Sequence, residues 1–313
     1  MPDPVYGRPM NAHNSDRPLL ALLIRLGGIM GLSIMAALIK LGSTRGIHIV
    51  EMMFWRQFIT LPILLGWAAM AGGVRLLSSK RPRAHAMRGI YGTIGMVFNF
   101  GAVIMLPLAE ATTIGFSAPI FAVMLAILLL KEKVGPWRWT AVLAGFAGII
   151  VIAQPGSGHF PLEGALVALT GAFMIALISI QIRELSLTES PMAIVFWFAV
   201  ITTLCTAPLL PFVGRAHAPL DWLILLGIGL AGTWGQLGIT MALRYGKVSS
   251  VIVMDYSSLV WATVLGLVLF DVLPTSTTWI GAPLIVASGI IIAWRERVLA
   301  KRNFADMRGA AGT

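Results

Sequence analysis

Residues 223–243 read LILLGIGLAGTWGQLGITMAL, without a single charged side chain. A helix needs about 20 mostly apolar residues to cross a hydrocarbon layer of about 30 Å, and this run meets that length. Hydrophobic residues make up 58% of the chain and the mean hydropathy is +0.87, which excludes an ordinary soluble domain. Ten such stretches lie near residues 19–41, 50–72, 88–107, 110–131, 136–153, 160–182, 191–213, 219–243, 248–270 and 275–296. Because backbone polar groups in lipid must be satisfied within each helix, the sequence predicts an all-α integral membrane protein with ten transmembrane helices.

The positive charge is distributed unevenly over the connections between these stretches. All but five of the 23 lysines and arginines fall on the side that holds the N-terminus; the others are Lys40, Arg45 and Arg215 on the opposite side and Arg25 and Arg56 within spans. The positive-inside rule then puts both termini in the cytoplasm, which requires an even number of spans. We therefore expect a multi-pass protein of the cell inner membrane, and we interpret the net charge of +10 as orientation rather than nucleic-acid binding.

Two polar tails flank the spans, a cytoplasmic N-terminal tail at residues 1–18 and a basic cytoplasmic tail at residues 298–313. The first apolar stretch is too long and too uninterrupted for a cleaved signal peptide, so we expect a retained helix. The only cysteine, Cys205, lies within the seventh span, which excludes an intramolecular disulfide.

The second five spans repeat the first five, which divides the chain into units at 19–155 and 156–297. At an offset of 137 residues, three glycines and a polar residue of the third span match the eighth: Gly92, Gly95, Gly101 and Asn99 fall on Gly229, Gly232, Gly238 and Gln236. Further on the offset becomes 140, with Trp139 on Trp279, which predicts a three-residue insertion within the ninth span. Five spans per unit is an odd number, so the repeats are inverted. Such repeats place a substrate near the membrane midplane and permit alternating access.

Polar residues within spans are the candidates for substrate contact, because they are costly in lipid and are usually functional. Asn99 and Gln236, as repeat partners, are predicted to face each other across a central cavity formed by spans 1, 3, 4, 6, 8 and 9, and Tyr91 shares a helix face with Asn99. Hydrogen bonding between helices is the alternative role for the two amides. Trp234 lies deep enough to line the same pocket, with lipid contact or core packing as its alternatives.

Asp255 and Tyr256 stand in an otherwise apolar ninth span. The carboxylate has three possible roles: it binds a substrate ammonium, carries a coupling proton, or pairs with Arg56 or Arg244. The remaining candidates are structural or coupling charges. Arg56 has a structural pairing as its first interpretation and carboxylate binding as its second, Glu51 lies five residues before it, and Lys40 and Glu110 lie at span ends where they are expected to reach water.

Enzymatic motifs are absent from the sequence. It contains no His-Glu-x-x-His pair, no Gly-x-Ser-x-Gly elbow and no phosphate-binding loop, and its five histidines are scattered over tails and loops. Residues 227–232 match a dinucleotide fingerprint, but they lie inside an apolar span, where small residues favour close helix packing. We therefore expect no enzymatic activity, no metal site and no cofactor.

Several motifs in the first unit resemble one transporter family. They are Arg88-Gly89 at the start of the third span, Ser117-Ala118-Pro119, Lys131-Glu132-Lys133, Trp139, the run Gly145-Phe146-Ala147-Gly148, and Glu51 followed by Phe54-Trp55-Arg56. Together they are similar to EamA-type members of the drug/metabolite transporter superfamily, and the resemblance covers nearly the whole chain. The second unit departs from the first in having Tyr256-Ser257-Ser258 and no proline in the region that corresponds to Pro119.

This resemblance implies a ten-helix, inverted-repeat secondary transporter of small organic metabolites. Our leading interpretation of the cargo is an amino acid or a related zwitterion, exported or exchanged across the inner membrane. The alternative is an uptake carrier for a heterocycle such as S-adenosylmethionine or riboflavin, and an intramembrane enzyme or channel is a remote third. The expected partners are the small-molecule substrate and the lipid bilayer, with the protein a monomer or a weak dimer.

Overall fold

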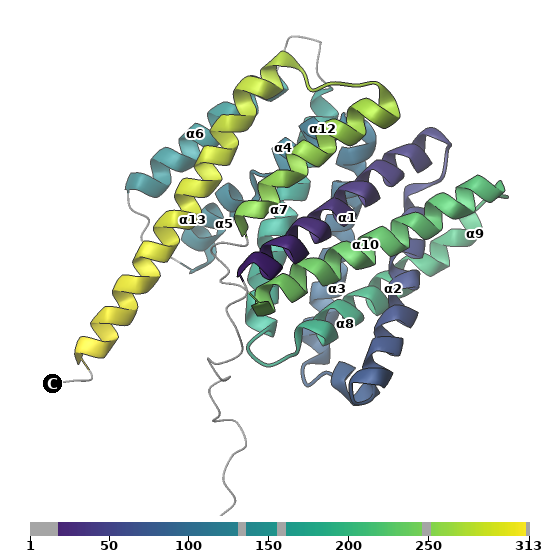
Figure 1. Cartoon of the computed structure of the whole chain (residues 1–313), viewed down its shortest axis with the longest axis horizontal. Helices are drawn as coiled ribbons and strands as arrows, with labels where there is room; N and C mark the ends of the chain where they lie inside the picture. Colours follow the sequence, from purple (N-terminus) through teal and green to yellow (C-terminus); the bar gives the residue numbers. More distant parts are fainter. Residues whose placement is uncertain (1–17, 131–135, 155–160, 246–251, 311–313) are drawn as a thin grey trace, which may run out of the picture.

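The computed structural model describes residues 18–130, 136–154, 161–245 and 252–310, and these residues form helices and short connections without strands (Figure 1). The first unit contains α1 (Pro18–Thr44), α2 (Ile49–Ala71), η1 (Val74–Leu77), α3 (Pro82–Met105), α4 (Leu108–Gly115), α5 (Ala118–Leu130) and α6 (Pro136–Ala153). The second contains α7 (Leu162–Leu185), α8 (Pro191–Thr206), η2 (Ala207–Leu209), α9 (Leu210–Val213), α10 (Pro219–Tyr245), η3 (Ile252–Tyr256), α12 (Ser257–Phe270) and α13 (Ser276–Ala310). The all-α prediction is confirmed.

Seven segments of the described chain are long and apolar enough to cross a membrane, and the helices at Trp139–Ala153 and Met254–Phe270 are shorter but equally apolar. Together with α3, which carries more polar residues, they account for the ten predicted spans. Three spans are built from pieces: α4 with α5, α8 with η2 and α9, and η3 with α12. Membrane helices tolerate such breaks where other protein elements satisfy the freed backbone groups.

Helix packing follows the inverted repeat. Helix α1 of the first unit lies along α10, and the equivalent helix of the second unit, α7, lies along α3. In the same way, α2 packs on α10 and its equivalent α8 packs on α3. The last helices of the two units, α6 and α13, pack on each other. The α1, α10 and α2 helices run side by side in Figure 1, and α13 lies beside α6 at the opposite edge. The two units therefore form one interleaved bundle rather than two separate domains.

Glycine contacts give the register of this repeat. A Cβ on Gly89 would meet Ile201, and one on Gly229 would meet Ile59. Two hydroxyl pairs follow the same relation: Thr93 contacts Thr202 at 2.8 Å and Thr60 contacts Thr233 at 2.7 Å between Oγ1 atoms. Each equivalent pair of α3 and α10 positions, 89 with 229 and 93 with 233, is separated by 140 residues.

The predicted offset of 137 for this span is therefore wrong, and no insertion within the ninth span is needed. At the offset of 140, Asn99 corresponds to Ile239, so Asn99 and Gln236 are not repeat partners. The error has a simple cause. Glycines recur every three residues in both helices, at 89, 92 and 95 and at 229, 232 and 235, so sliding one helix by three residues again superposes glycine on glycine.

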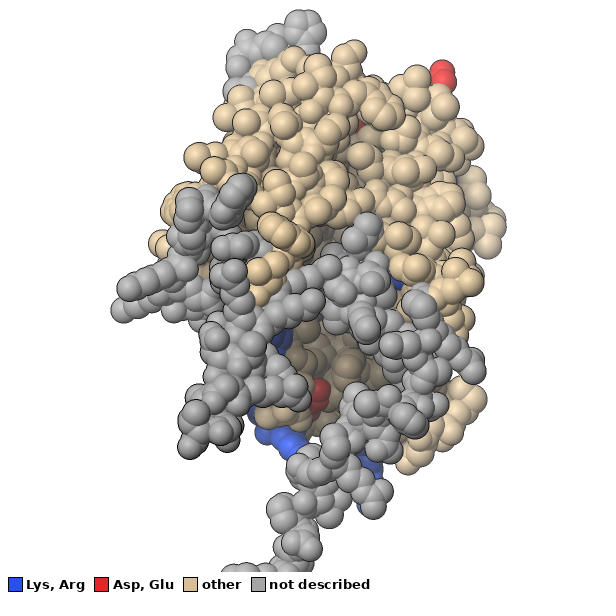
Figure 2. Space-filling model, turned by 60° about the vertical axis from the view of Figure 1, so that its left-hand side comes forward, with Lys and Arg blue, Asp and Glu red and all other residues tan. Residues whose placement is uncertain are grey.

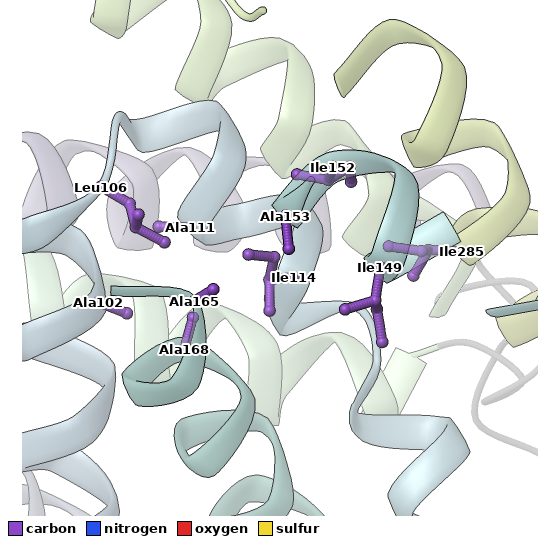
Figure 3. Close-up of a cluster of buried hydrophobic side chains, with 10 residues drawn as sticks. All are labelled: Ala102, Leu106, Ala111, Ile114, Ile149, Ile152, Ala153, Ala165, Ala168 and Ile285. Carbon is purple, nitrogen blue, oxygen red and sulfur yellow. The ribbon is translucent and has the colours of Figure 1, made fainter. Parts of the chain in front are cut away.

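One buried apolar cluster joins α3, α4, α6, α7 and α13 (Figure 3). Its members are Ala102, Leu106, Ala111, Ile114, Ile149, Ile152, Ala153, Ala165, Ala168 and Ile285. Alanines from α3 and α7 face the branched side chains of α4 and α6 in this view. Small residues on one side let the helix backbones approach closely, and the isoleucines fill the space that remains.

Lys40 and Glu110 both hydrogen-bond to helix ends, and Glu110 is fully buried, in contrast to the prediction that it reaches water. The Lys40 ammonium donates to the carbonyl oxygens of Val103, Ile104 and Leu106, at 3.1, 3.4 and 2.6 Å, where α3 ends. Glu110 is fully buried and accepts from the Thr275 amide at 2.9 Å, next to the first turn of α13. Both positions match the helix dipole, a cation at a C-terminus and an anion at an N-terminus.

Glu51 belongs to a second polar cluster, between the α1–α2 connection and the start of α10. Its Oε1 lies 2.7 Å from His217 Nε2, and its Oε2 accepts from the His48 amide at 3.2 Å, which caps α2. Asp221 receives the Arg45 Nε at 2.5 Å in the same cluster. The Glu51 carboxylate is therefore held by a loop and a histidine, and no bridge joins it to Arg56.

Candidate substrate-binding site

Two interrupted helices meet at the centre of the bundle. The fourth span breaks between α4 and α5, and the ninth changes from η3 to α12 at Tyr256. The offset of 140 relates Phe116 at the first break to Tyr256 at the second, and their rings contact edge to face with centroids 5.0 Å apart. The serine hydroxyls beside the breaks satisfy local carbonyls: Ser117 donates to Ile114 at 2.6 Å and Ser258 donates to Asp255 at 2.6 Å.

A cavity of about 500 Å³ surrounds this crossing. Its walls come from α1, the α4–α5 break, α7, η3 and α13, and its polar groups are Arg25, Ser179, Asp255 and Tyr256. The remaining walls are mostly apolar, as in sites that enclose small molecules. The space-filling view shows a hollow in the lower part of the molecule with acidic and basic side chains at its mouth (Figure 2).

The ionic centre of the cavity is a two-bond pair between Arg25 and Asp255. Arg25 Nε and Nη2 donate to the two Asp255 carboxylate oxygens at 2.7 and 2.6 Å, and Nη1 donates to the Ile239 carbonyl at 3.2 Å. Only 7% of the Arg25 side chain is exposed, against 38% for Asp255. Such bidentate, charge-assisted contacts are short and strong. Both residues line the cavity, and the carboxylate is the more exposed member of the pair.

Arg25 corrects the sequence-based prediction that Arg56 or Arg244 pairs with Asp255. The Arg244 side chain lies outside the described residues, and Arg56 contacts sulfur atoms of Met35 and Met96 rather than a carboxylate. The usable signal was the opposite sign of two intramembrane charges, since Arg25 and Asp255 both lie within spans and such charges usually pair.

The other predicted contact residues lie away from this cavity. Asn99 donates to the Gly95 carbonyl of its own helix at 2.7 Å and packs against Gly171 of α7. Gln236 and Tyr91 are partly buried on α10 and α3 and do not line the cavity. Of the six predicted residues, the structure brings together Asp255 and Tyr256, and it adds Arg25, Phe116 and Ser179, which the prediction missed.

Trp234 lines a different space, an open groove of about 1040 Å³ between α1 and α10. This groove is almost wholly apolar, and 48% of the Trp234 residue is exposed in it. An apolar surface on the outside of a membrane bundle suits lipid chains. The spans that form the central cavity also differ from the prediction, because among the described residues α13 contributes to its wall while α3 and α10 do not.

The sequence matches the EamA-like transporter family over residues 19–154 and 162–294. It is 25% identical over 252 residues to an S-adenosylmethionine uptake transporter of Rickettsia prowazekii, covering 80% of this chain and 85% of that protein. It is 27% identical over 247 residues to a riboflavin transporter of Vibrio cholerae, covering 78% and 83%, and 30% identical over 264 residues to the pseudopaline exporter CntI of Pseudomonas aeruginosa, covering 83% and 91%.

One solved crystal structure resembles this fold with a TM-score of 0.58 at 22% identity, covering 90% of this chain and 99% of that one. At this identity the likeness supports the fold alone. The three named relatives differ in what they carry and include both uptake and export proteins.

Proposed function

This chain belongs to the EamA-like transporter family, and from that premise we propose that it exports or exchanges a small zwitterionic metabolite, an amino acid or a close relative. It is a multi-pass membrane transporter and not an enzyme. The substrate would bind in the cavity at the Phe116–Tyr256 crossing, with Arg25 and Asp255 as its charged contacts. Asp255 would receive the ammonium group and Arg25 the carboxylate.

The Arg25–Asp255 pair is the observation that supports this cargo. One cation and one anion 2.6 Å apart form the complement of a molecule whose own two charges are close together. The rest of the cavity is mostly apolar and suits an uncharged side chain. A substrate with a single charge would leave one partner of the pair without a counter-ion, which is costly where water is excluded.

We further propose that the cavity faces the cytoplasm in this conformation. Arg25 lies near the start of α1, and Ile292 and Ala293 lie late in the apolar part of α13, so the lining is nearer to the end of the bundle where these helices meet the tails. The excess of lysine and arginine on that side supports a cytoplasmic position in the cell inner membrane. Alternating access would then close this end and open the other.

A second cargo class has one specific observation in its favour. The Phe116 and Tyr256 rings lie in the cavity wall and contact each other edge to face. A flat heterocycle with an attached polar group could pack against either ring. Uptake of such a molecule is the alternative to export of an amino acid.

An exchange assay in liposomes tests the proposal. Purified protein is reconstituted, a mixed pool of amino acids, S-adenosylmethionine, riboflavin and nucleosides is added outside, and the molecules that enter are identified by mass spectrometry. We expect saturable, protein-dependent entry of one or more amino acids. Entry of a heterocycle alone would reject the amino-acid assignment, and entry of none of them would count against the cargo classes named here.

Gly289 is predicted to set the width of the cavity. A Cβ at this position would lie 2.5 Å from the Tyr256 hydroxyl, so Gly289→Ala should push the phenol into the cavity. One methyl group in a binding pocket changes recognition by about 10- to 200-fold, and we expect the apparent KM to rise by roughly tenfold. Adding Tyr256→Phe, which removes the clashing oxygen, should restore most of the affinity. An unchanged KM in Gly289→Ala would show that this wall does not touch the substrate.

A further inference from the structure

Two arginines of the bundle have no carboxylate partner among the described residues. Arg56 projects from α2 between α1, α3 and α10, where its Nε lies 3.1 Å from the Met35 sulfur and its Nη1 lies 3.8 Å from the Met96 sulfur. A Cβ on Gly232 would lie 3.0 Å from the same Nε. Thioether sulfur is a weak acceptor, so these contacts do not compensate a full positive charge.

Arg88 is the second of these arginines. It is 7% exposed, and its Nε and Nη1 atoms are buried without a hydrogen-bond acceptor. Its guanidinium carbon lies 4.4 Å from the centre of the Phe198 ring, and a Cβ on Gly92 would lie 2.3 Å from Nη1. The aromatic face attracts the cation but offers no lone pair to its N–H groups.

Both guanidinium groups lie against α3 within one helical turn of each other: Arg56 Nη1 lies beside Met96, and Arg88 Nη1 lies beside Gly92. Several charges of the described chain do have ionic partners: Arg25 with Asp255, Arg45 with Asp221, Arg81 with Glu184, and His217 with Glu51. A guanidinium does not lose its proton in proteins, so neither group can become neutral to escape burial. Buried charges are normally paired, and no carboxylate of the described residues provides this counter-charge.

The inverted repeat shows that the unpaired positive charge of Arg56 has no equivalent in the second unit. Arg56 packs on Gly232 as Phe198 packs on Gly92, and the two glycines are 140 residues apart, so Arg56 and Phe198 occupy equivalent places. The second unit therefore has an aromatic ring where the first has a cation. Arg88 lies on that ring, which brings both cations to the region where α2, α3, α8 and α10 meet.

We propose that Arg56 and Arg88 together bind a small anion, at a site distinct from the Arg25–Asp255 cavity. The ligand chemistry is a halide or a carboxylate, because both are compact and accept several N–H donors. The anion comes either from the solution, as chloride, or from the carboxylate of a second cargo molecule bound here. The site does not depend on the cargo proposed above, since its counter-charge is required in the resting protein.

Thermal unfolding of the purified protein in detergent tests this site without a transport measurement. Chloride is titrated against the bulky sulfonate MES at constant ionic strength and constant potassium. We expect the apparent Tm to rise with the logarithm of chloride concentration above the dissociation constant, by roughly 5 °C at about 100 times that constant. Arg56→Gln and Arg88→Gln should lose this increment. Arg81→Gln, which removes a solvent-accessible arginine paired with Glu184, should keep it.

Two further arms separate the sources of the anion. A carried amino acid that removes the chloride effect, while its carboxamide does not, identifies the substrate carboxylate as the natural ligand; a chloride effect that persists beside the amino acid identifies free chloride. Should the glutamine variants fail to fold, Arg56→Lys and Arg88→Lys keep the charge and should need at least severalfold higher chloride for the same rise in Tm. A wild-type Tm that ignores chloride, or a chloride effect that all four variants retain, would overturn the proposal and leave the transport function untouched.

Discussion

Asp255→Asn is expected to abolish transport, with a loss of about 100-fold or more in the initial rate. The variant keeps the size of the side chain and one acceptor oxygen, but it removes the charge that faces the cavity and leaves Arg25 buried without a counter-ion. Removing one partner of a hydrogen-bonded charge pair in a binding site costs about 2–5 kcal/mol of binding free energy, and about 1.4 kcal/mol is a factor of ten. Initial rates of entry into liposomes, normalised to the amount of folded protein, measure the effect.

The double variant Arg25→Gln/Asp255→Asn separates a structural pair from a substrate site. If the pair only holds α1 to η3, neutralising both members removes the unpaired charge and should restore folding and transport together. If the pair binds the two charges of a zwitterion, the double variant should fold and remain inactive, which is our expectation. Asp271→Asn is the matched control, because that aspartate is exposed where α12 ends and should keep the wild-type rate.

The fold was predictable because the bilayer imposes simple rules. Span length follows from hydrocarbon thickness, and five spans per unit force the inverted orientation. The residue-by-residue alignment of the two units was harder to predict from the sequence. The three-residue glycine spacing of α3 and α10 gives several alignments of similar quality, and only contacts between helices, such as Gly89 with Ile201, choose one of them.

Site residues were predictable where the cost of placing a charge in lipid marked them. They were not predictable where the rotation of a helix about its axis determines which side chains face the cavity. Asp255 was predicted because a carboxylate within a span is rare and usually functional. Its partner Arg25 was not predicted, because it lies 230 residues away in the chain. Trp234 and Asn99 show the limit. Both lie deep in their spans, but Trp234 turns to an outer groove and Asn99 bonds to its own helix. Sequence position gives depth, and packing against neighbours decides which face of the helix meets the cavity.

Gly238→Val should destabilise the bundle. The α1 and α10 helices approach backbone to backbone at this point: a Cβ on Gly238 would lie 2.8 Å from the Gly28 Cα and 3.2 Å from its nitrogen. Backbone atoms of two long helices cannot move aside as a flexible side chain can. Overpacking of tight interiors costs about 1–3 kcal/mol and occasionally more, and we expect the upper end, a fall of roughly 5–10 °C in apparent Tm. Size-exclusion chromatography and thermal unfolding in detergent measure it.

Gly66→Val is the matched control for this prediction, because it introduces the same side chain into the apolar helix α2 at a position where a Cβ meets no atom within 4 Å. It should elute as a single species with a Tm close to that of the wild type. Equal Tm values for the two variants would mean that α1 and α10 separate at little cost. The close glycine contact would then not hold α1, and the position of Arg25 opposite Asp255 would depend on the ion pair itself.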